Sequence, residues 1–424
     1  MFDSTRLAGL AAEAGRRGPD VRSDCWVKVT ANHSGGIEVQ ARTKVETMYG
    51  EAVRRLTREV LDHAGVAHAS VELEDAGALP FVQAARLEAA VRRLAAAAGL
   101  GEGKEAVPEY LPEFAAEAQY PTERDRFRRS RLYLPGDEPK FMLNAGLHAP
   151  DGVILDLEDS VAPVAKDEAR LLVRNALRAI DFRGAERMVR INQGERGLVD
   201  LDFIVPHNVH VILIPKVESP EQVRAVDERI SQVLQSPSRQ RGDLPASNKG
   251  IGPPRPWLMP IVESALGAWR AYEIATASPH TCALTIGLED YTADIGTQRT
   301  NEGRESFWAR CQVVNAARAA GVQPIDTVFS DVADMEGLRA SVLEAKALGF
   351  DGKGCIHPRQ IRVIHEAFAP APAELEKARK IVAAFNEAQE KGLGVVALGS
   401  KMIDPPVVKR ALRVVRLAEA LGQG

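Results

Sequence analysis

The sequence predicts an α/β protein whose largest part is a (β/α)8 TIM barrel, preceded by a small α+β domain and followed by a helical extension. The chain has 424 residues, more than one hydrophobic core usually organises, which favours a small domain plus a barrel-sized one. Eight short apolar runs alternate with amphipathic helical stretches, as parallel βα units require. Polar groups follow every run, which favours a closed barrel over an open doubly wound sheet.

Residues 1–100 are predicted to form the small domain. Alternating apolar residues predict strands at 25–31 and 37–41, and His33-Ser34-Gly35-Gly36 between them predicts a hairpin. A helix over 45–63, a strand over 69–74 and a helix over 78–98 complete a βαβα-type unit, the last helix because it is rich in Ala, Leu, Arg and Glu. Residues 101–125 contain Pro, Gly and many acids without a clear period, which predicts a linker.

The predicted barrel domain spans residues 126–370, and residues 371–424 form the predicted helical extension. The irregular stretch 235–256 predicts a surface insertion between two barrel elements. All strand carboxyl ends of a parallel barrel open onto one face, where the active site forms. The eight apolar runs span residues 131–134, 152–156, 187–191, 211–214, 257–262, 283–286, 322–326 and 352–356.

Composition and charge indicate a globular protein with a small substrate. The chain is 45% hydrophobic and 26% charged with a net charge of -4, which gives no electrostatic reason to expect nucleic acid or an anionic membrane as partner. The four cysteines form no CxxC pair, which argues against structural zinc and disulfides and fits a reducing cytoplasm. Neither a signal peptide nor a membrane-spanning run is apparent, so we expect a cytoplasmic protein.

Two acids after neighbouring runs suggest a metal site. Glu263 follows the fifth run and Asp290 the sixth, and magnesium is typically bound by one or two carboxylates plus substrate oxygens and water. The alternative is that each acid stabilises the start of the helix that follows it. Both interpretations are open from the pattern alone.

A further cluster of charged residues follows the second, third and fourth runs. Arg190 brings a guanidinium that can hold a carboxylate or a developing enolate oxygen, or it forms a salt bridge with a loop acid. Asp156, Glu158 and Asp159 are more acids than one metal needs, so some of them should orient Arg190, Lys216 or the metal's surroundings. We expect Asp156 to act in catalysis and Glu158 and Lys216 to contact the substrate.

Other candidates have simpler explanations. His357 follows the eighth run and is as compatible with a structural hydrogen bond as with acid–base work. His207 and His210 precede a strand, away from the chemical face, and are interpreted as structural. Lys353 is expected to pair with barrel acids, because a Schiff-base role is less economical beside a metal.

Three motifs in order carry a family resemblance: RSRLYLPG at 129–136, VILDLEDSVAP at 153–163 and VRIN at 189–192. Further motifs are PKVE at 215–218, IVESALG at 261–267, GLEDY at 287–291, GK at 352–353, IHP at 356–358 and QI at 360–361. Over roughly residues 129–421 the chain resembles the citrate lyase β-chain and malyl-CoA lyase (aldolase/citrate lyase) family. The resemblance implies a (β/α)8 lyase that uses Mg2+ and an acyl-CoA thioester substrate.

The resemblance also implies residue roles. Glu263 and Asp290 look like the family's magnesium ligands, Arg190 like its substrate-polarising arginine, and Arg129 like a contact to substrate or coenzyme. The motif GSKMIDP at 399–405 resembles the terminal motif whose aspartate handles protons at a neighbouring subunit's barrel mouth, which makes Asp404 the candidate. A homo-oligomer, a trimer or hexamer, follows from that role.

The front domain resembles the citrate lyase γ-chain, an acyl carrier. The matching segments are SDC at 23–25, GIEV at 36–39, DAGAL at 75–79 and ARLEAA at 85–90. The family has a pair of serines before the aspartate, one of which bears a prosthetic group derived from coenzyme A, whereas this chain has Arg22-Ser23. Ser23 is the candidate attachment site, and the alternative is a retained fold used for assembly or to shape the acyl-binding cleft.

These resemblances imply a carbon–carbon lyase that cleaves a citryl-, malyl- or citramalyl-type 3-hydroxyacyl thioester into an acyl thioester and a 2-oxo acid. One alternative is a thioesterase acting on a malyl-type CoA thioester, and another is a non-catalytic carrier or assembly subunit of a lyase complex. No stretch resembles the citrate lyase α-chain, so an α-type subunit is a candidate partner.

Overall fold

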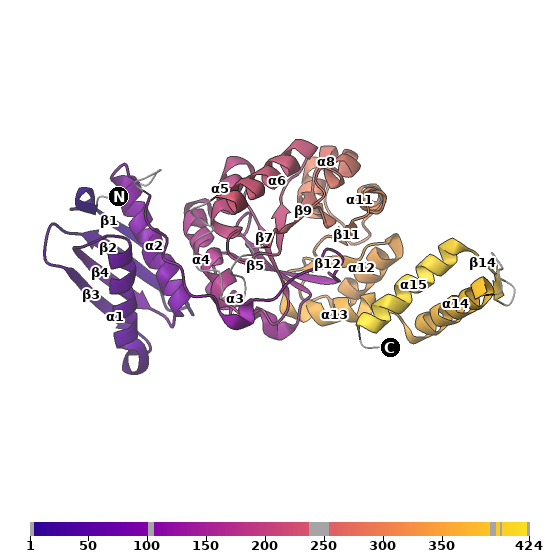
Figure 1. Cartoon of the computed structure of the whole chain (residues 1–424), viewed down its shortest axis with the longest axis horizontal. Helices are drawn as coiled ribbons and strands as arrows, with labels where there is room; N and C mark the ends of the chain where they lie inside the picture. The colour runs from indigo at the N-terminus through magenta and orange to yellow at the C-terminus, as the bar shows by residue number, and fades with distance from the viewer. Residues whose placement is uncertain (1–3, 101–105, 237–253, 391–395, 399–400, 422–424) are drawn as a thin grey trace.

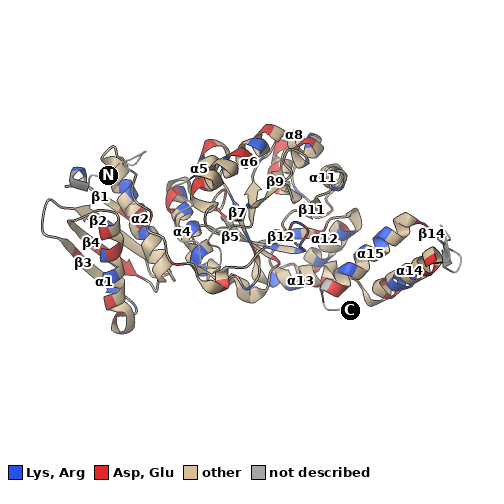
Figure 2. Cartoon of the chain, in the orientation of Figure 1, with Lys and Arg blue, Asp and Glu red and all other residues tan. Residues whose placement is uncertain are grey.

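Three parts follow one another along the chain in the computed structural model, with the front domain and the C-terminal segment at opposite ends of a central barrel (Figure 1). The structure describes residues 4–100, 106–236, 254–390, 396–398 and 401–421. Lys and Arg residues are interspersed with Asp and Glu residues on helices of all three parts (Figure 2). No helix within these ranges is long and apolar enough to cross a membrane.

The central part is a closed barrel of eight parallel strands, as predicted. The ring closes where Cys355 of the last strand pairs with Leu132 of the first. Several strands are buried at every position, because the barrel interior covers one face and helices cover the other. The strands are β5 (Ser130–Pro135), β6 (Gly152–Asp156), β7 (Glu186–Arg190), β8 (Val211–Ile214), β9 (Trp257–Val262), β10 (Ala283–Ile286), β11 (Gln323–Asp326) and β12 (Gly352–Cys355).

Helices between these strands cover the outside of the barrel. Amphipathic sequences such as that at 220–235 place one apolar face on the barrel, where Val223, Val226, Ile230 and Val233 are buried. The predicted insertion at 235–256 lies mostly outside the described residues. The helical elements are α3 (Pro139–Met142), η4 (Ala145–His148), η5 (Pro163–Ala165), α4 (Lys166–Ala179), α5 (Gly194–Ile204), α6 (Pro220–Gln235), α8 (Ala265–Trp269), α9 (Ala271–Ala275), α10 (Leu288–Asp294), α11 (Phe307–Ala320), α12 (Met335–Leu348) and α13 (Pro358–Phe368).

The front domain is a four-stranded sheet in the order β1-β2-β4-β3 with two helices. The predicted strands and helices are present, and the first strand and a short 3-10 helix were not predicted. The elements are η1 (Ser4–Leu7), β1 (Ala11–Gly15), β2 (Cys25–Ala31), β3 (Ile37–Thr43), α1 (Glu46–His63), β4 (Ala69–Asp75) and α2 (Pro80–Ala97).

The predicted hairpin between β2 and β3 is wrong, because β4 lies between these strands. The connecting loop instead bonds to the start of β4: the Asn32 amide donates to the His68 carbonyl at 2.9 Å, and the Gly36 amide donates to His68 Nδ1 at 3.0 Å. β4 forms seven-residue ladders with both β2 and β3. Insertion of β4 therefore satisfies the backbone groups on both of its edges.

Helix α2 joins the front domain to the barrel, since it packs on its own sheet and on α4. Arg174 of α4 donates to Glu88 of α2 at 2.6 Å, and both side chains are buried. Asn175 Nδ2 donates to the Phe81 carbonyl at 3.0 Å. These buried polar contacts specify one docked arrangement of the two parts.

The segment between the front domain and the barrel, predicted as a linker, contains one short 3-10 helix, η3 (Ala116–Ala118), within its described residues 106–125. It lies against the barrel: Tyr120 Oη donates to the Ala185 carbonyl at 2.8 Å, and Arg187 Nη2 donates to the Tyr120 carbonyl at 3.0 Å. These contacts lie at the amino ends of the strands, opposite the mouth.

The C-terminal part is an antiparallel pair of helices, α14 (Pro372–Glu390) and α15 (Pro405–Ala420), which project from the barrel (Figure 1). Ile381, Ile403 and Val408 are buried between them. The predicted helical extension is confirmed. The strands β13 (Val396–Leu398) and β14 (Lys401–Ile403), which pair with each other, were not predicted.

Candidate active site

An arginine and an aspartate face each other where β6 and β7 end. Asp156 and Arg190 are the last residues of these strands and are paired in register. Arg190 Nε and Nη2 donate to the two carboxylate oxygens of Asp156, each at 2.7 Å. Burial alone would raise the pKa of Asp156, but the bonds from Arg190 outweigh it and hold the pKa below its usual value. Asp156 therefore stays ionised and orients the guanidinium.

Glu158 lies on the other side of Arg190. Its Oε2 is 2.9 Å from Arg190 Nη1, and Gln193 Nε2 donates to its Oε1 at 2.7 Å. Burial and then the neighbouring Asp159 raise the pKa of Glu158. Arg190 thus forms salt bridges with nearby acids, as one of the two interpretations of the sequence expected, and it also presents a fixed cation at the barrel mouth.

Lys216 connects the acids of the mouth. Its backbone has φ 48°, a left-handed conformation that is costly for a non-glycine residue, and its amide donates to Glu263 Oε1 at 2.6 Å. Its Nζ lies 3.3 Å from Glu158, 3.4 Å from Asp159 and 3.5 Å from Asp290. Burial lowers the pKa of Lys216, but these acids outweigh it and raise the pKa above its usual value. Lys216 is therefore held as a cation.

The predicted metal ligands follow the next two strands. Glu263 comes directly after β9 and is 5% exposed, whereas Asp290 lies in the first turn of α10 with a side chain that is 44% exposed. Burial, and also the negative charge of Asp290, raise the pKa of Glu263 to about 8 against the effect of the bond from the Lys216 amide. A buried carboxylate whose ionised form is disfavoured, with a second acid near it, is a favourable place for a divalent cation.

The donor set fits magnesium. A Cβ at Gly287 would lie 2.5 Å from Glu263 Oε2, so glycine leaves room for this oxygen. Glu263 does not cap the helix after it, because Ser264 does so by accepting from the Gly267 amide. The described residues contain no group of three or more His, Cys, Asp or Glu side chains that could hold a metal. Further ligands would come from substrate and water, as is usual for magnesium.

Three other predicted site residues are not brought to this mouth. Arg129 precedes β5 at the opposite end of the barrel, where its guanidinium donates to Asp151 at 2.8 Å. Asp404 caps α15 by accepting from the Val407 amide at 3.2 Å. Ser23 lies in the front domain before β2. A residue at the amino end of a strand cannot reach a ligand at the carboxyl ends, so Arg129 has no substrate contact from its place in this structure.

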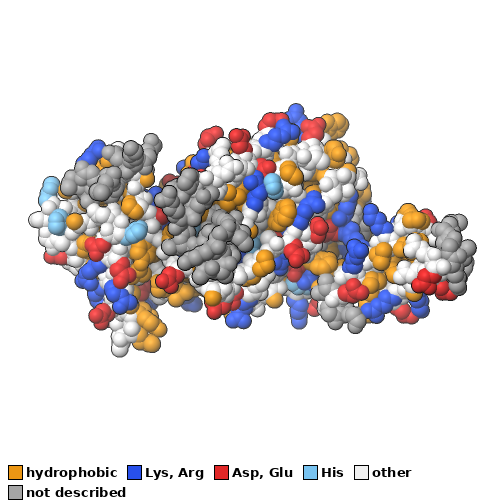
Figure 3. All heavy atoms as spheres, in the orientation of Figure 1, with side chains coloured by type: hydrophobic (Ala, Val, Ile, Leu, Met, Phe, Trp, Pro, Cys, Tyr) orange, Lys and Arg blue, Asp and Glu red, His pale blue; other side chains and the backbone are white. Residues whose placement is uncertain are grey.

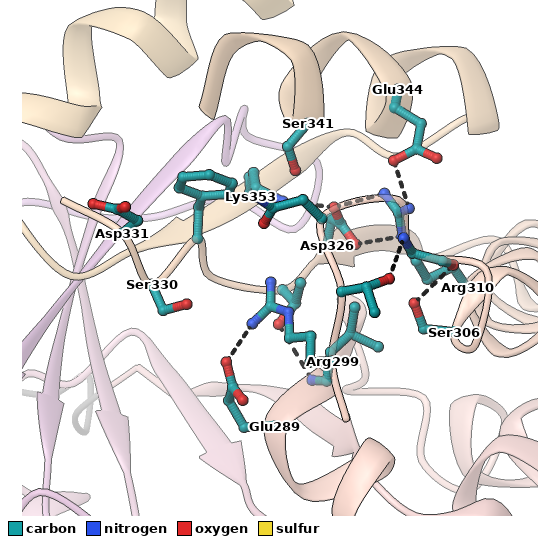
Figure 4. A pocket seen from close by; sticks show the side chains of 16 residues that line it. Glu289, Arg299, Ser306, Arg310, Asp326, Ser330, Asp331, Ser341, Glu344 and Lys353 are labelled. Atoms are coloured by element: carbon teal, nitrogen blue, oxygen red, sulfur yellow. Dashed lines mark hydrogen bonds and ion pairs between the residues drawn. The ribbon is translucent and has the colours of Figure 1, made fainter. Parts of the chain in front are cut away.

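A polar pocket lies on the helix side of β11 and β12 (Figure 4). Lys353 Nζ donates to Asp326 at 2.8 Å, and Arg310 donates to the same carboxylate. Burial lowers the pKa of Lys353 against the effect of Asp326. Lys353 thus pairs with a barrel acid, as expected, and His357 caps α13 by accepting from the Arg359 amide.

Sequence reasoning missed three residues of the mouth: Gln193, Tyr133 and Gly287. Gln193 holds Glu158, and the Tyr133 ring lies 5.4 Å from the Arg190 guanidinium. Gly287 directly follows β10, and a glycine at a strand end is a signal of close approach. The contacts of Gln193 and Tyr133 join different strands and leave no local sequence signal.

Residues 129–358 match the family model described as HpcH/HpaI aldolase/citrate lyase. The chain belongs to this family. Residues 298–423 also match a model described as C-C bond lyase of the TIM-barrel fold. The resemblance to the aldolase/citrate lyase family is confirmed.

Members of this family that resemble the chain carry lyase names. Citrate lyase subunit beta of Haemophilus influenzae is 39% identical over 297 residues, which cover 70% of this chain and 98% of that protein. Mitochondrial citramalyl-CoA lyase of Mus musculus is 34% identical over 69% of this chain and 87% of its own length. L-malyl-CoA/beta-methylmalyl-CoA lyase of Cereibacter sphaeroides is 33% identical over 70% of this chain and 96% of its own length. The predicted enzyme class, a carbon–carbon lyase, is confirmed.

Solved structures of CitE from Mycobacterium tuberculosis share the fold. One, in complex with magnesium, acetoacetate and coenzyme A, is 31% identical with a TM-score of 0.56 and covers 70% of this chain and 100% of that chain. Another, with magnesium and pyruvate, is 30% identical with a TM-score of 0.50 and covers 69% of this chain and 99% of that chain.

The front domain matches a second family. Residues 18–94 match the ACP model, described as malonate decarboxylase delta subunit (MdcD). The predicted acyl-carrier likeness is confirmed, and the matched family is this delta subunit. The aldolase/citrate lyase barrel therefore follows an acyl-carrier-like domain in one chain.

Proposed function

We propose that the chain cleaves a carbon–carbon bond of a citryl-, malyl- or citramalyl-type 3-hydroxyacyl thioester in a magnesium-dependent reaction, giving an acyl thioester and a 2-oxo acid. The observation that carries this proposal is the meeting of Glu263 and Asp290 with a fixed Arg190 at one barrel mouth. The names of the lyase relatives and the magnesium, pyruvate and coenzyme A complexes of CitE support it.

Glu263 and Asp290 are the proposed magnesium ligands. The ion, when bound, supplies a Lewis acid for the oxygens of the 2-oxo acid half of the substrate. Lys216 holds the Glu263 carboxylate through its amide and keeps a positive charge among Glu158, Asp159 and Asp290. Lys216 thus limits repulsion between the acids and a substrate carboxylate.

Arg190 is the proposed stabiliser of developing negative charge. As the C3 hydroxyl loses its proton and the C2–C3 bond breaks, the bonding electron pair passes into the thioester enolate. Asp156 and Glu158 already orient the guanidinium, so it meets this charge without reorganisation. The α-carbon of the enolate then takes up a proton to give the acyl thioester.

Asp404, in the mouth of a second subunit, is the proposed acid and base: its carboxylate accepts the C3 hydroxyl proton and then donates a proton to the enolate carbon. β14, at the tip of the C-terminal projection away from the barrel, ends one residue before Asp404 (Figure 1). An aspartate held there serves a site only when another copy approaches. A homo-oligomer, a trimer or hexamer, satisfies this requirement.

An exposed aromatic surface beside the mouth supports the contact between copies. The rings of Trp269 of α8 and Trp308 of α11 stack with centroids 6.1 Å apart while 73% and 51% exposed, and Tyr272 of α9 and Phe307 of α11 are exposed as well. Figure 3 shows hydrophobic side chains along this edge. Exposed apolar patches of this kind mark association surfaces, and we assign this one to a second copy of the chain.

The front domain and the compartment complete the proposal. Ser23 is the proposed attachment point if the substrate is carried on a tethered group, and a citrate lyase α-type subunit would then be the partner that loads it. The cytoplasm is the proposed compartment, because its reducing conditions suit the four free cysteines.

The deciding assay is turnover of malyl-, citramalyl- and citryl-CoA by the full-length protein with magnesium. Mass spectrometry detects the 2-oxo acid, and a thiol reagent detects free coenzyme A. A 2-oxo acid without free coenzyme A supports the lyase, whereas free coenzyme A without a 2-oxo acid indicates the thioesterase. Inactivity towards all three contradicts use of free thioesters.

Variants test the residues. Glu263→Gln or Asp290→Asn should abolish magnesium-dependent turnover with the fold intact. Glu289→Gln is the matched control, since its exposed carboxylate pairs with Arg299, and it should retain activity. Unchanged kinetics in both ligand variants would exclude the metal assignment.

The proposed role of Asp404 is tested by mixing subunits. Asp404→Asn and Glu263→Gln should each be inactive alone. When the two are dissociated and reassembled together, some mouths combine an intact Glu263 with an intact Asp404 from another copy, so activity should return. No recovery in confirmed mixed oligomers would contradict action in a second subunit.

A further inference from the structure

A second pocket lies in the front domain, where the parallel strands β3 and β4 end. It has a volume of about 290 Å3. Ligands of α/β sheets commonly bind beyond the carboxyl ends of parallel strands. The lining residues are Arg16, Arg17, Gly18, Arg42, Thr43, Lys44, Glu74, Asp75 and Ala76.

The pocket has more cations than acids, and two of its cations are not neutralised by an acid among the described residues. Asp75 accepts from the Gly77 and Ala78 amides and from Thr43, so it serves the local turn. Arg17 lies 3.5 Å from Glu74. Within the described ranges, neither Arg42 nor Lys44 forms an ion pair, and both are exposed. Because no acid neutralises them, these two side chains can pair with an oxyanion.

Ser23, the candidate attachment site, lies beside this pocket. Its amide donates to the carbonyl of Ala76 at 3.0 Å, and Lys44 Nζ donates to the carbonyl of Val21 at 3.5 Å. Ala76 and Lys44 both line the pocket. The segment 21–23 therefore runs along its rim, where Val21 contacts Lys44.

The pocket is also fixed to the mouth side of the barrel. Arg16, which lines it, forms ion pairs with Asp137 and Glu138 in the loop after β5. Arg86 is buried and donates both to Asp24, next to Ser23, at 2.8 Å and to the Asp137 carbonyl at 3.1 Å. This loop follows a strand carboxyl end, so the pocket and the mouth lie on the same side of the barrel.

We infer that this front-domain pocket binds the phosphate groups of a coenzyme-A-type nucleotide while the acyl end reaches the mouth. The nucleotide is either the free thioester substrate or a group attached to Ser23, and both present phosphate to Arg42 and Lys44. The identity of the acyl end rests on the proposed function, but phosphate binding does not require turnover.

The test is binding of pyrophosphate and of coenzyme A to the full-length protein by calorimetry at low ionic strength. Arg42→Gln/Lys44→Gln removes both free cations and should weaken binding by about tenfold or more. Arg55→Gln/Arg58→Gln removes the same charge from exposed positions on α1 and should bind as the wild type does. Equal binding by all three proteins, or no binding by wild-type protein without a group on Ser23, would overturn the inference.

Intact-mass spectrometry of protein from the cells that naturally make it separates the two sources. An added mass that disappears in Ser23→Ala identifies the attached group, and its phosphorus NMR signal should then shift in Arg42→Gln/Lys44→Gln. An unmodified mass together with coenzyme A binding identifies the free thioester. Pocket binding without lyase turnover would contradict only the proposed function.

Discussion

Gly287→Ala is the smallest change expected to disturb the proposed metal site without removal of a ligand. A Cβ at this position would lie 2.5 Å from Glu263 Oε2 and 3.0 Å from Glu263 Cβ, whereas relaxed contacts are about 3.5 Å. The backbone of Gly287, at φ -110° and ψ 109°, is open to alanine. The carboxylate must therefore move by about 1 Å, and a displacement of that size costs on the order of 10²-fold in rate.

The assay for Gly287→Ala is turnover against magnesium concentration, with thermal unfolding measured in parallel. We expect kcat/KM to fall by about 100-fold, or about 3 kcal/mol, while the unfolding temperature changes little. Ser264→Ala is the control, because it removes the α8 cap at a cost of about 1 kcal/mol in stability and leaves the carboxylate in place. A Gly287→Ala protein with the magnesium dependence of the wild type would refute this reasoning.

Four further predictions follow from the charges. Because the pKa of Glu263 is raised to about 8, magnesium affinity should rise about tenfold per pH unit up to about pH 8, and calorimetry should detect proton release that is absent in Glu263→Gln. In the unfolded chain Glu263 loses this proton near pH 4.5, so the metal-free protein should lose stability as pH rises from 4.5 towards 8. Urea unfolding at several pH values checks this expectation. Arg190→Lys cannot hold Asp156 bidentately and should lower kcat by on the order of 10²-fold, and an unchanged kcat would contradict this. Arg174→Met should lower the free energy of unfolding, measured in urea, by about 3 kcal/mol, because Glu88 loses its buried partner. An unaltered urea midpoint would argue against this prediction.

Much of the barrel is predictable from sequence because its strands carry their own signal. The runs at 152–156, 211–214, 257–262 and 283–286 coincide with β6, β8, β9 and β10. Strands buried on both faces read as short apolar segments whatever their neighbours are. The pairing of β2 with β4 has no such signal. The turn residues between β2 and β3 predicted that these two strands pair with each other, but β4, more than thirty residues later in the chain, pairs with β2 instead.

The sequence by itself determined which chemical groups stand at the strand ends: Asp156, Arg190, Lys216, Glu263 and Asp290 each follow or end a predicted run. Family motifs around them indicated the enzyme class. Periodicity and spacing are local properties, and the placement of these groups at strand ends required nothing else.

Only the tertiary structure decided how those groups meet. Closure of the barrel sets the distances between strand ends, so it determined that Lys216 contacts three acids and that Gly287 approaches Glu263. It also placed Arg129 at the opposite end of the barrel. The pocket with Arg42 and Lys44 forms from strands far apart in the chain, because side-chain proximity depends on packing between elements and not on the order of residues within them.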